Sequence, residues 1–450
     1  MGSSEYLKAP PATDKMPKAV PYILANECGE RFCFYGTRCI LTIFMTQYLL
    51  GASGILAPLN EQQSKAVFHA FVAAVYLMPI AGALLSDIWL NKFKTIIVFS
   101  IVYCVGVFAL VLDQTRLGLS IGLVLIALGS GIIKPCVSAN VGDQFGRHNQ
   151  HLISKVYSWF YFSINVGAFV AQFFVVPRLL DRYGPKVAFS VPFFLMVFAT
   201  GAFWLGRKKM VHLPAAGVGF VKECFSGEGL RALGKLCIIY IFIWPFWAIF
   251  DQMDSAWVLL ARDMNLKWLG HEWLPSQIAS VNPLMILILI PIFSYFIYPG
   301  LNKFFRLTPL WKISLGLFLA SAVFLVPAHV ATRIEAGQSP RVWWLFLAHL
   351  ILAASEVMVS ITCLEFSYTQ APKKMKSFIM SVFFLSIFAG NLFTSILNIL
   401  IERVESLKSL TGTSYYLFFV KIMVVTAVLF VFVAVFYKQK TYIQDEAPSS

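Results

Sequence analysis

The sequence predicts an all-α polytopic membrane protein in which twelve transmembrane helices form two six-helix bundles. Of the 450 residues, 58% are hydrophobic and only 13% are charged, whereas charged residues make up about a quarter of an ordinary soluble domain. The mean hydropathy is +0.74. Apolar runs of bilayer-spanning length recur along the whole chain, and one longer polar connection separates the first six from the last six.

Each predicted span is close to the length of about 20 residues that a bilayer-spanning helix needs. The spans cover residues 21–50, 66–90, 94–112, 119–139, 155–176, 187–206, 234–257, 277–300, 311–331, 342–364, 376–401 and 415–437. Because their number is even, both ends of the chain are expected on the same side of the membrane.

The distribution of Lys and Arg indicates which side that is. Of the 36 basic residues, 21 fall in the tails and loops on the side of the termini and 11 fall on the opposite side. Cytoplasmic loops carry the excess of positive charge, so both termini are predicted to be cytoplasmic in a multi-pass protein of the cell membrane. The net charge of +14 is therefore interpreted as topology and not as nucleic-acid binding. No cleavable signal peptide is expected.

The longest connection defines the predicted domains. It is basic, contains Gly and Pro, and is too short for a folded domain of its own. The predicted division is a cytoplasmic tail at 1–20, a six-helix bundle at 21–206, a cytoplasmic linker at 207–233, a second six-helix bundle at 234–437 and a cytoplasmic tail at 438–450. This layout is typical of a transporter whose two bundles rock around a site at the middle of the membrane.

The first apolar run contains four charged side chains, Glu27, Glu30, Arg31 and Arg38. Each charge at mid-bilayer costs roughly 2.5–3.5 kcal/mol, and such residues usually face a bundle interior and mark a substrate or proton pathway. Helical spacing places all four, with Tyr35, on one face. The group is either a structural ion pair or part of a functional site. Two acids, two bases and a tyrosine exceed what a structural pair requires.

Two later spans also contain single ionisable groups. Lys134 lies among small residues, so its ammonium either pairs with Glu27 or Glu30 or extends to the cytoplasmic surface. Glu356 lies mid-span with no cation in its own helix. It is therefore satisfied by a basic group of another helix, by the ammonium of a ligand, or by a proton of its own. Either of the last two alternatives is consistent with a binding site.

Other polar residues lie nearer the ends of the spans. Asp87, at the cytoplasmic turn between the second and third spans, is expected to form a gate or a latch between the bundles. His69 is interpreted as a hydrogen-bonded structural histidine in preference to a proton relay. Asp251 and Asp254 form a pair late in the seventh span.

The sequence contains none of the motifs expected of an enzyme or an ATP-driven pump. There is no P-loop, no GxSxG, no HExxH and no pair of catalytic carboxylates in a soluble region. The eight cysteines lack CxxC spacing and an accompanying set of histidine ligands, so neither a disulfide framework nor a metal site is expected. A channel would need a continuous polar stripe on several helices, and a receptor would need a larger cytoplasmic module.

The segment ECGERFCFYG, residues 27–36, resembles the E-x-x-E-R-F-x-Y-Y-G signature of the proton-dependent oligopeptide transporter family. Similar segments follow in order, namely FVAAVYLMPIAGALLSDIWLNKFKTI, GSGIIKPCVSANVGDQF, FYFSINVGA, FWAIFDQ and SEVMVSITCLEFSYTQAP. They cover nearly the whole chain, from residue 21 to beyond 390. The resemblance implies the major facilitator fold in a compact, bacterial-type member that imports di- and tripeptides together with protons. A functional monomer is expected.

The resemblance also implies roles for residues at matching positions. The proton-coupling cluster would be Glu27, Glu30, Arg31 and Lys134. The peptide pocket would be lined by Tyr35, Arg38, Tyr76, Lys134 and Asn165 in the first half and by Asn282 and Glu356 in the second. Gating would involve Asp87, Arg38 and Asp251, with Asp251 pairing across the cavity with Arg38. Protons would be the coupling ion, and no cofactor is expected.

Peptide chemistry is consistent with these roles, because a peptide is a zwitterion that needs a cationic pole and an anionic pole. Arg31, Arg38 and Lys134 would supply the first, and Glu356 with two asparagines the second. The alternatives are a carrier of another small anion, such as nitrate, or of a peptide-like drug on the same fold, or a transport-deficient nutrient receptor. A nitrate carrier would have no use for Glu356.

Four positions depart from the family pattern. Phe34 replaces the first tyrosine of the signature, Asn91 replaces the glycine usual after D-x-W-L, and Phe383 stands where a tryptophan is frequent. Asp254 is an additional charge to which the pattern assigns no role. Phe34 is expected to affect the range of peptides, Asn91 the turn after the second span, and Phe383 the side-chain pocket and the outer gate.

Overall fold

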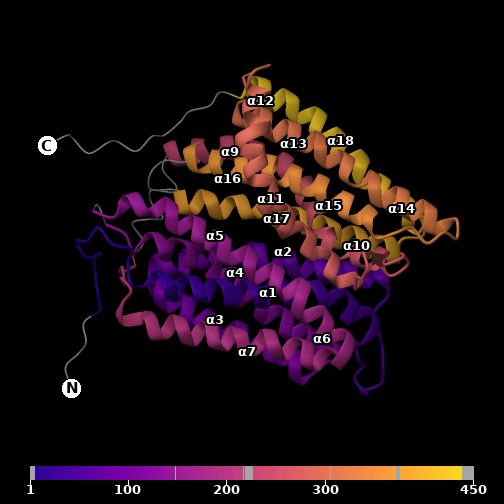
Figure 1. The fold of residues 1–450 in the computed structure, drawn as a ribbon, viewed down its shortest axis with the longest axis horizontal. Helices are drawn as coiled ribbons and strands as arrows, with labels where there is room; N and C mark the ends of the chain where they lie inside the picture. The colour runs from indigo at the N-terminus through magenta and orange to yellow at the C-terminus, as the bar shows by residue number, and fades with distance from the viewer. Residues whose placement is uncertain are drawn as a thin grey trace.

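The computed structural model describes residues 6–437, except residues 147, 216, 218–226, 305 and 371–375. The chain is almost entirely helical within these ranges (Figure 1). Eleven helical segments of the described residues combine membrane-spanning length with high hydropathy. The first helix, at 28 residues, also has the length, but it contains the four charges noted in the sequence. Each of the twelve predicted spans corresponds to a helical segment.

The first half of the chain forms six long helical segments. In order these are α1 (Val20–Gln47), α2 (Glu61–Leu85) with the π turn η1 (Ser86–Leu90), α3 (Lys92–Leu112), α4 (Arg116–Gly142), the 3₁₀ turn η2 (Gln150–Leu152) before α5 (Ile153–Phe169), which continues through the π turn η3 (Val170–Val175) into α6 (Val176–Tyr183), and α7 (Pro185–Leu205) with η4 (Gly206–Lys208).

The second half is also built of six long segments, several of them interrupted. They are α9 (Gly227–Phe250) with η5 (Asp251–Asp254) and α10 (Ala256–Ala261); η6 (Pro275–Ser280), α11 (Val281–Ile292), η7 (Phe293–Ile297) and α12 (Tyr298–Asn302); α13 (Pro309–Val323) with α14 (Leu325–Glu335); α15 (Trp343–Glu356), η8 (Val357–Ile361) and α16 (Thr362–Gln370); α17 (Lys376–Arg403), followed by η9 (Glu405–Leu407); and α18 (Gly412–Phe436). A two-residue antiparallel hairpin, β1 (Lys267–Trp268) and β2 (His271–Glu272), pairs Lys267 with Glu272.

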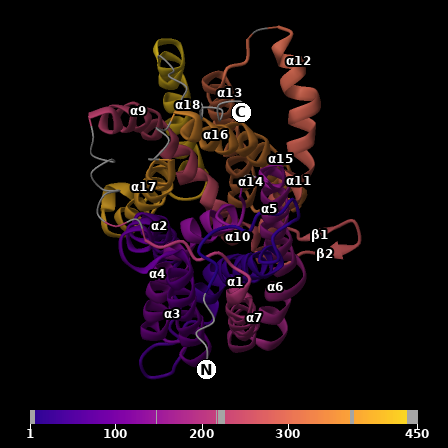
Figure 2. The ribbon, with the colours of Figure 1, turned by 90° about the vertical axis from the view of Figure 1, so that its left-hand side faces the viewer.

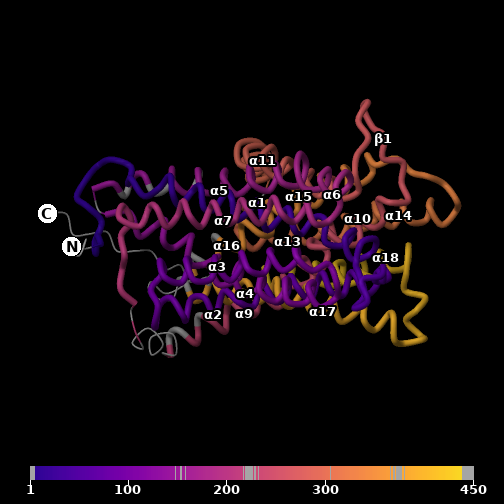
Figure 3. The backbone as a smooth tube through the Cα atoms, turned by 90° about the horizontal axis from the view of Figure 1, so that it is seen from below, coloured from indigo at the N-terminus to yellow at the C-terminus, as the bar shows by residue number. Residues whose placement is uncertain are grey.

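The helices of the two halves form two groups that lie side by side (Figures 1 and 2). Buried apolar side chains form one core among residues 19–211, joined by Val258, and further cores among residues 236–430. Most of the long helices run roughly parallel to the long axis of the molecule, whereas the segment of α11 and α12 is steeply tilted to it (Figures 2 and 3). We call the end at which α1 begins the terminal end, and the opposite end, which carries α6, α14 and the hairpin, the far end (left and right in Figure 1).

Asn91, one of the departures from the family pattern, lies in the turn between η1 and α3. Its φ is 62° and its ψ is 160°, a backbone conformation that is nearly restricted to glycine. The asparagine side chain caps α3, because its Oδ1 accepts a hydrogen bond from the Lys94 backbone N–H at 3.0 Å. The cap offsets part of the backbone strain, so the turn forms without glycine.

We expect Asn91→Ala to lower the free energy of unfolding by about 1–2 kcal/mol, because alanine keeps the strained backbone and loses the cap. Asn91→Gly should be at least as stable as the wild type, since glycine adopts this conformation without strain. Thermal unfolding of the purified protein in detergent measures both. An alanine variant as stable as the glycine variant would contradict this account of the turn.

Candidate functional site

A cavity of about 520 Å³ lies between the two groups of helices. Nine of the predicted site residues line it, namely Glu27, Arg31, Tyr35, Arg38, Tyr76, Lys134, Asn165, Asn282 and Glu356. Its volume lies within the range of small-molecule sites. Ser138 and Tyr157, which lie toward the terminal end of α4 and α5, also line it. The cavity therefore extends from the middle of the helices toward the terminal end.

The two acids of α1 are both bound by Arg31. Its Nε lies 2.6 Å from Glu27 Oε1 and 3.0 Å from Glu30 Oε2. Glu30 does not line the cavity; its Oε1 accepts a hydrogen bond from Ser130 Oγ of α4 at 2.8 Å. The i, i+3, i+4 spacing thus forms a compact ion-pair cluster. It reduces the cost of burying the two carboxylates and is anchored to α4 through Ser130.

Lys134 does not make the predicted pair with an acid. Its Nζ lies 3.9 Å from the centre of the Phe34 ring and 5.1 Å from the centre of the Tyr76 ring. The ammonium makes no hydrogen bond or ion pair with any residue that the structure describes. The residue is 9% exposed and lines the cavity, so it does not extend to the terminal surface either. Aromatic faces stabilise the cation there while its N–H groups stay available to a ligand.

Glu356 forms the opposite pole of the cavity. It ends α15, and its Oε2 accepts a hydrogen bond from Asn282 Nδ2 of α11 at 3.1 Å. Among the described residues no cation pairs with this carboxylate. Asn165, across the cavity on α5, donates its Nδ2 to the Tyr161 carbonyl at 2.9 Å. The cavity is therefore dipolar: the unpaired Lys134 ammonium of α4 lies on one side and the Glu356 carboxylate of α15 on the other.

Arg38 forms ion pairs with two acids of the second half of the chain. Its guanidinium forms an ion pair with Asp251, and its Nε lies 2.9 Å from Asp254 Oδ2. The pairing of Arg38 with Asp251 agrees with the prediction from the family pattern. Asp254, to which the pattern assigned no role, is the second partner. Although Arg38 touches the cavity, its charge is already satisfied in this conformation.

His69 belongs to the same buried network. Its Nδ1 lies 2.7 Å from Asn391 Oδ1 and its Nε2 lies 2.9 Å from Ser255 Oγ. Asn391 in turn donates its Nδ2 to Asp251 Oδ2 at 2.6 Å. This geometry fits a neutral imidazole that donates from Nδ1 and accepts at Nε2. His69 is hydrogen-bonded on both sides, as the structural interpretation predicted, and it connects α2 with α17.

We call these six residues the inter-half network: Arg38, His69, Asp251, Asp254, Ser255 and Asn391. Other bonds join the halves nearer the far end. Arg262 pairs with Glu61, and Glu402 accepts hydrogen bonds from Asn60 at 3.1 Å and Gln63 at 2.5 Å. Together these contacts close the cavity toward the far end.

Asp87 and Phe383 lie outside the cavity. Lys92, near Asp87 in sequence, pairs with Asp143 at 2.7 Å and not with Asp87. Asp87 has no bond to the second half among the residues that the structure describes, so its gating role stays a prediction. Phe383 is buried against Tyr240, whereas the next residue, Phe384, lines the cavity.

A model of a known protein family matches most of the chain. The model PTR2, described as the POT family, matches residues 93–223 and 219–415. The chain is 35% identical over 367 residues to "Peptide transporter family 1" of Drosophila melanogaster, covering 71% of this chain and 48% of that protein. It is 34% identical over 398 residues to human "Solute carrier family 15 member 2", covering 77% and 53%. The chain thus spans about half the length of these curated relatives.

Solved structures match over nearly the whole chain. The "In meso crystal structure of the POT family transporter PepTSo" has a TM-score of 0.86 and 31% sequence identity, and the match covers 94% of this chain and 99% of that one. The "Crystal structure of auto inhibited POT family peptide transporter" has a TM-score of 0.86 and 28% identity, covering 96% and 99%. The arrangement of the helices over nearly the whole chain is therefore shared with these proteins.

Proposed function

The chain belongs to the POT family, and on that basis we propose that it is a proton-coupled symporter that imports di- and tripeptides by alternating access. Members of this family are transporters and not enzymes. The predicted fold class, an all-helical major facilitator fold, is confirmed by the agreement with solved POT structures. The chain spans only about half the length of its curated relatives, and its own cavity supplies further support for this activity.

The observation that carries this proposal is the pair of opposite charges on the two walls of the cavity, Lys134 and Glu356, neither of which has an ion-pair partner among the described residues. The unpaired Lys134 ammonium suits a peptide carboxylate, and Glu356 with Asn282 suits a peptide ammonium. Apolar residues that line the cavity, such as Phe160 and Ile286, would accept varied peptide side chains. A small anion such as nitrate would gain nothing from Glu356, so a zwitterionic peptide is the better substrate.

Proton coupling is proposed for the cluster of Glu27, Glu30 and Arg31 together with Lys134. A proton that neutralises Glu27 or Glu30 weakens the ion pairs of Arg31 and leaves more of its charge for the peptide carboxylate. Loss of the peptide then lets Arg31 bind both acids again, and the proton leaves. Protons are the coupling ion in this scheme, and no cofactor takes part.

We further propose that the terminal end faces the cytoplasm and that this conformation is open to the inside. The excess of Lys and Arg on the side of the termini supports the first point. The closing contacts at the far end and the extension of the cavity toward Ser138 support the second. The protein would act as a monomer in the cell membrane, because one chain supplies both poles of the cavity.

Uptake of a radiolabelled dipeptide into liposomes that contain the purified protein tests the function. We expect uptake above the equilibrium level when the outside is more acidic than the inside, and only equilibration without the gradient. A panel of dipeptides that all fail, together with robust uptake of another solute, would contradict the proposal.

We expect Glu356→Gln to reduce dipeptide uptake at least tenfold, because an amide cannot neutralise the peptide ammonium. The side chain keeps its size and its acceptor for Asn282, so the fold should persist. Removal of one charge-assisted hydrogen bond costs about 1.5–3 kcal/mol, which corresponds to a tenfold to hundredfold loss of affinity. Glu405→Gln, at an exposed site remote from the cavity, is the control. A Glu356→Gln variant with wild-type affinity would assign the ammonium to another site.

A further inference from the structure

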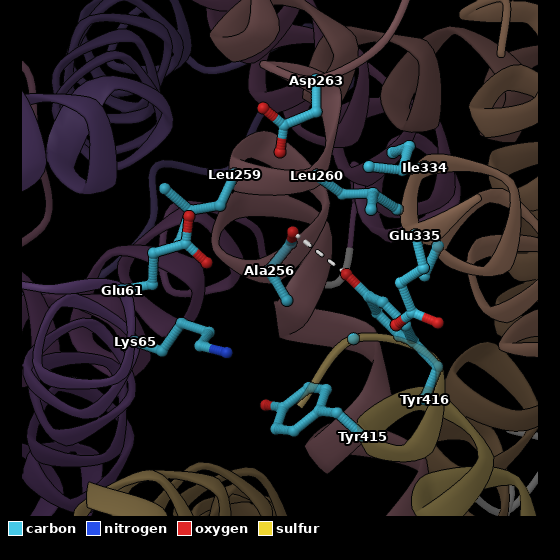
Figure 4. A pocket seen from close by; sticks show the side chains of 12 residues that line it. Glu61, Lys65, Ala256, Leu259, Leu260, Asp263, Ile334, Glu335, Tyr415 and Tyr416 are labelled. Atoms are coloured by element: carbon cyan, nitrogen blue, oxygen red, sulfur yellow. Dashed lines mark hydrogen bonds between the residues drawn. The ribbon is translucent and has the colours of Figure 1, made fainter. Parts of the chain in front are cut away.

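A second cavity, of about 150 Å³, lies between the two halves at the far end. One wall comes from α2, and the others come from α10, α14 and α18 (Figure 4). None of the residues that line it also lines the central cavity. Because its walls belong to both halves of the chain, its shape depends on the closure of the far end.

Lys65 of α2 supplies a buried cation to this cavity. The residue is only 8% exposed, and its Nζ lies 4.2 Å from the centre of the Tyr415 ring. The ammonium makes no hydrogen bond or ion pair with any residue in the described part of the chain, and it is directed into the cavity (Figure 4). Contact with a ring face leaves N–H donors unsatisfied, so an acceptor group placed in the cavity would bind there favourably.

Three carboxylates, those of Glu61, Asp263 and Glu335, also line the cavity (Figure 4). Glu61 is paired with Arg262. Glu335 accepts hydrogen bonds from the backbone N–H and the hydroxyl of Thr413, at 2.8 and 2.9 Å. Asp263 is exposed, and its carboxylate has neither a hydrogen bond nor an ion pair with the described residues. The cavity thus presents an unpaired carboxylate as well as an unpaired ammonium.

This combination selects one class of ligand. An inorganic anion would meet three carboxylates, and a simple cation would meet Lys65. A molecule with a carboxylate and an ammonium satisfies both unpaired groups. Leu259, Leu260 and Ile334 provide an apolar wall for a short side chain. The cavity is much smaller than the central one, which favours a single amino acid over a peptide.

We propose that this far-end cavity binds a free α-amino acid, whose carboxylate accepts hydrogen bonds from Lys65 and whose ammonium pairs with Asp263, and that binding holds the far end closed. Opening of the far end would separate Lys65 on α2 from Asp263 after α10. The ligand therefore binds the closed state better and increases its population. Amino acid outside the cell would then slow the return of the empty carrier without competing with peptide.

Calorimetry of the purified full chain tests binding directly. The probes are L-alanine, L-alanine methyl ester, which lacks the carboxylate, and N-acetyl-L-alanine, which lacks the ammonium. We expect L-alanine to bind and each analogue to bind about tenfold or more weakly. No binding of L-alanine, or equal binding of all three probes, would overturn the proposal. Binding of inorganic phosphate in place of L-alanine would also overturn it.

Two variants test which residue binds the carboxylate and which binds the ammonium of the amino acid. Lys65→Met should abolish the preference for L-alanine over its methyl ester, and Lys186→Met is the matched control at an exposed far-end lysine. Asp263→Asn should abolish the preference for L-alanine over N-acetyl-L-alanine, with Asp181→Asn as its control. Asp263 is exposed, so this variant should fold even if Lys65→Met does not. Unchanged preferences in Asp263→Asn would overturn the assignment.

A transport readout follows in liposomes. External L-alanine should lower the maximal rate of dipeptide uptake at least twofold without raising KM in the wild type, and it should have no effect in Asp263→Asn. An increase in KM alone would place the amino acid in the central cavity and overturn the proposal. The calorimetric test needs no transport, so it stands or fails separately from the symport function.

Discussion

Lys134→Ala is expected to abolish proton-driven accumulation of a dipeptide while leaving exchange of peptide across the membrane partly intact. Among the cations of the central cavity, Lys134 makes no ion pair with the described residues, whereas Arg31 binds two acids and Arg38 binds two more. Its removal takes away the cation that is most available to the peptide carboxylate. Arg31 and Glu356 remain, so weak binding and exchange should persist.

Lys134→Arg separates charge from proton transfer. Arginine keeps the positive charge over the Phe34 ring but does not release its proton in proteins. Because the proposed scheme places the coupling proton on Glu27 or Glu30, we expect this variant to bind peptide and to accumulate it under a proton gradient. Binding without accumulation would show that the lysine itself must release a proton. Both variants are measured by uptake and counterflow in liposomes, with Lys235→Ala at an exposed position as control. Full accumulation by Lys134→Ala would remove Lys134 from the proton-coupling cluster.

Arg38→Ala should destabilise the protein by about 3–5 kcal/mol, because it leaves Asp251 and Asp254 buried without a cation. Arg38 is 1% exposed and the two aspartates are 2% and 0% exposed, so the guanidinium is the cation that compensates two deeply buried carboxylates. The loss should appear as a lower unfolding temperature in detergent, together with loss of transport.

The triple variant Arg38→Ala, Asp251→Asn, Asp254→Asn should recover much of that stability, since it removes the uncompensated charges. Asn391 can still bond to residue 251 through an amide oxygen. Recovery of stability without recovery of transport would separate the structural and the gating roles of the network. If the single variant is as stable as the wild type, the ion pairs contribute little to closure.

The sequence predicted the helices well because hydropathy and length alone decide where a chain can cross a bilayer. The spacing of Glu27, Glu30 and Arg31 also predicted their cluster, since residues three and four apart share a helix face. These are local properties, so they can be read along a single segment. The opposed poles of the cavity also followed from the residues, with help from the family pattern.

Contacts between distant segments were harder to predict. The prediction that Lys134 pairs with an acid was wrong. Arg31 binds both candidate acids, and the Lys134 ammonium lies over the Phe34 ring instead. Asp254 received no role, although it lies one helical turn after Asp251 and shares its partner. The closing role of Asn391 had no sequence signal at all. Such pairings depend on how the helices pack against one another, and the spacing of residues along the sequence carries no information about that packing.

The π turn η8 has a mechanical consequence. It begins directly after Glu356, so the carboxylate lies on the far-end side of a local widening of the helix. Such turns weaken the regular hydrogen bonding of a helix and concentrate bending at one point. We expect the helix to bend at η8, so that residues 362–370 move while Glu356 keeps its position in the binding site. Distances between spin labels on either side of η8 should change when peptide binds. Constant distances would show that the helix does not bend at η8.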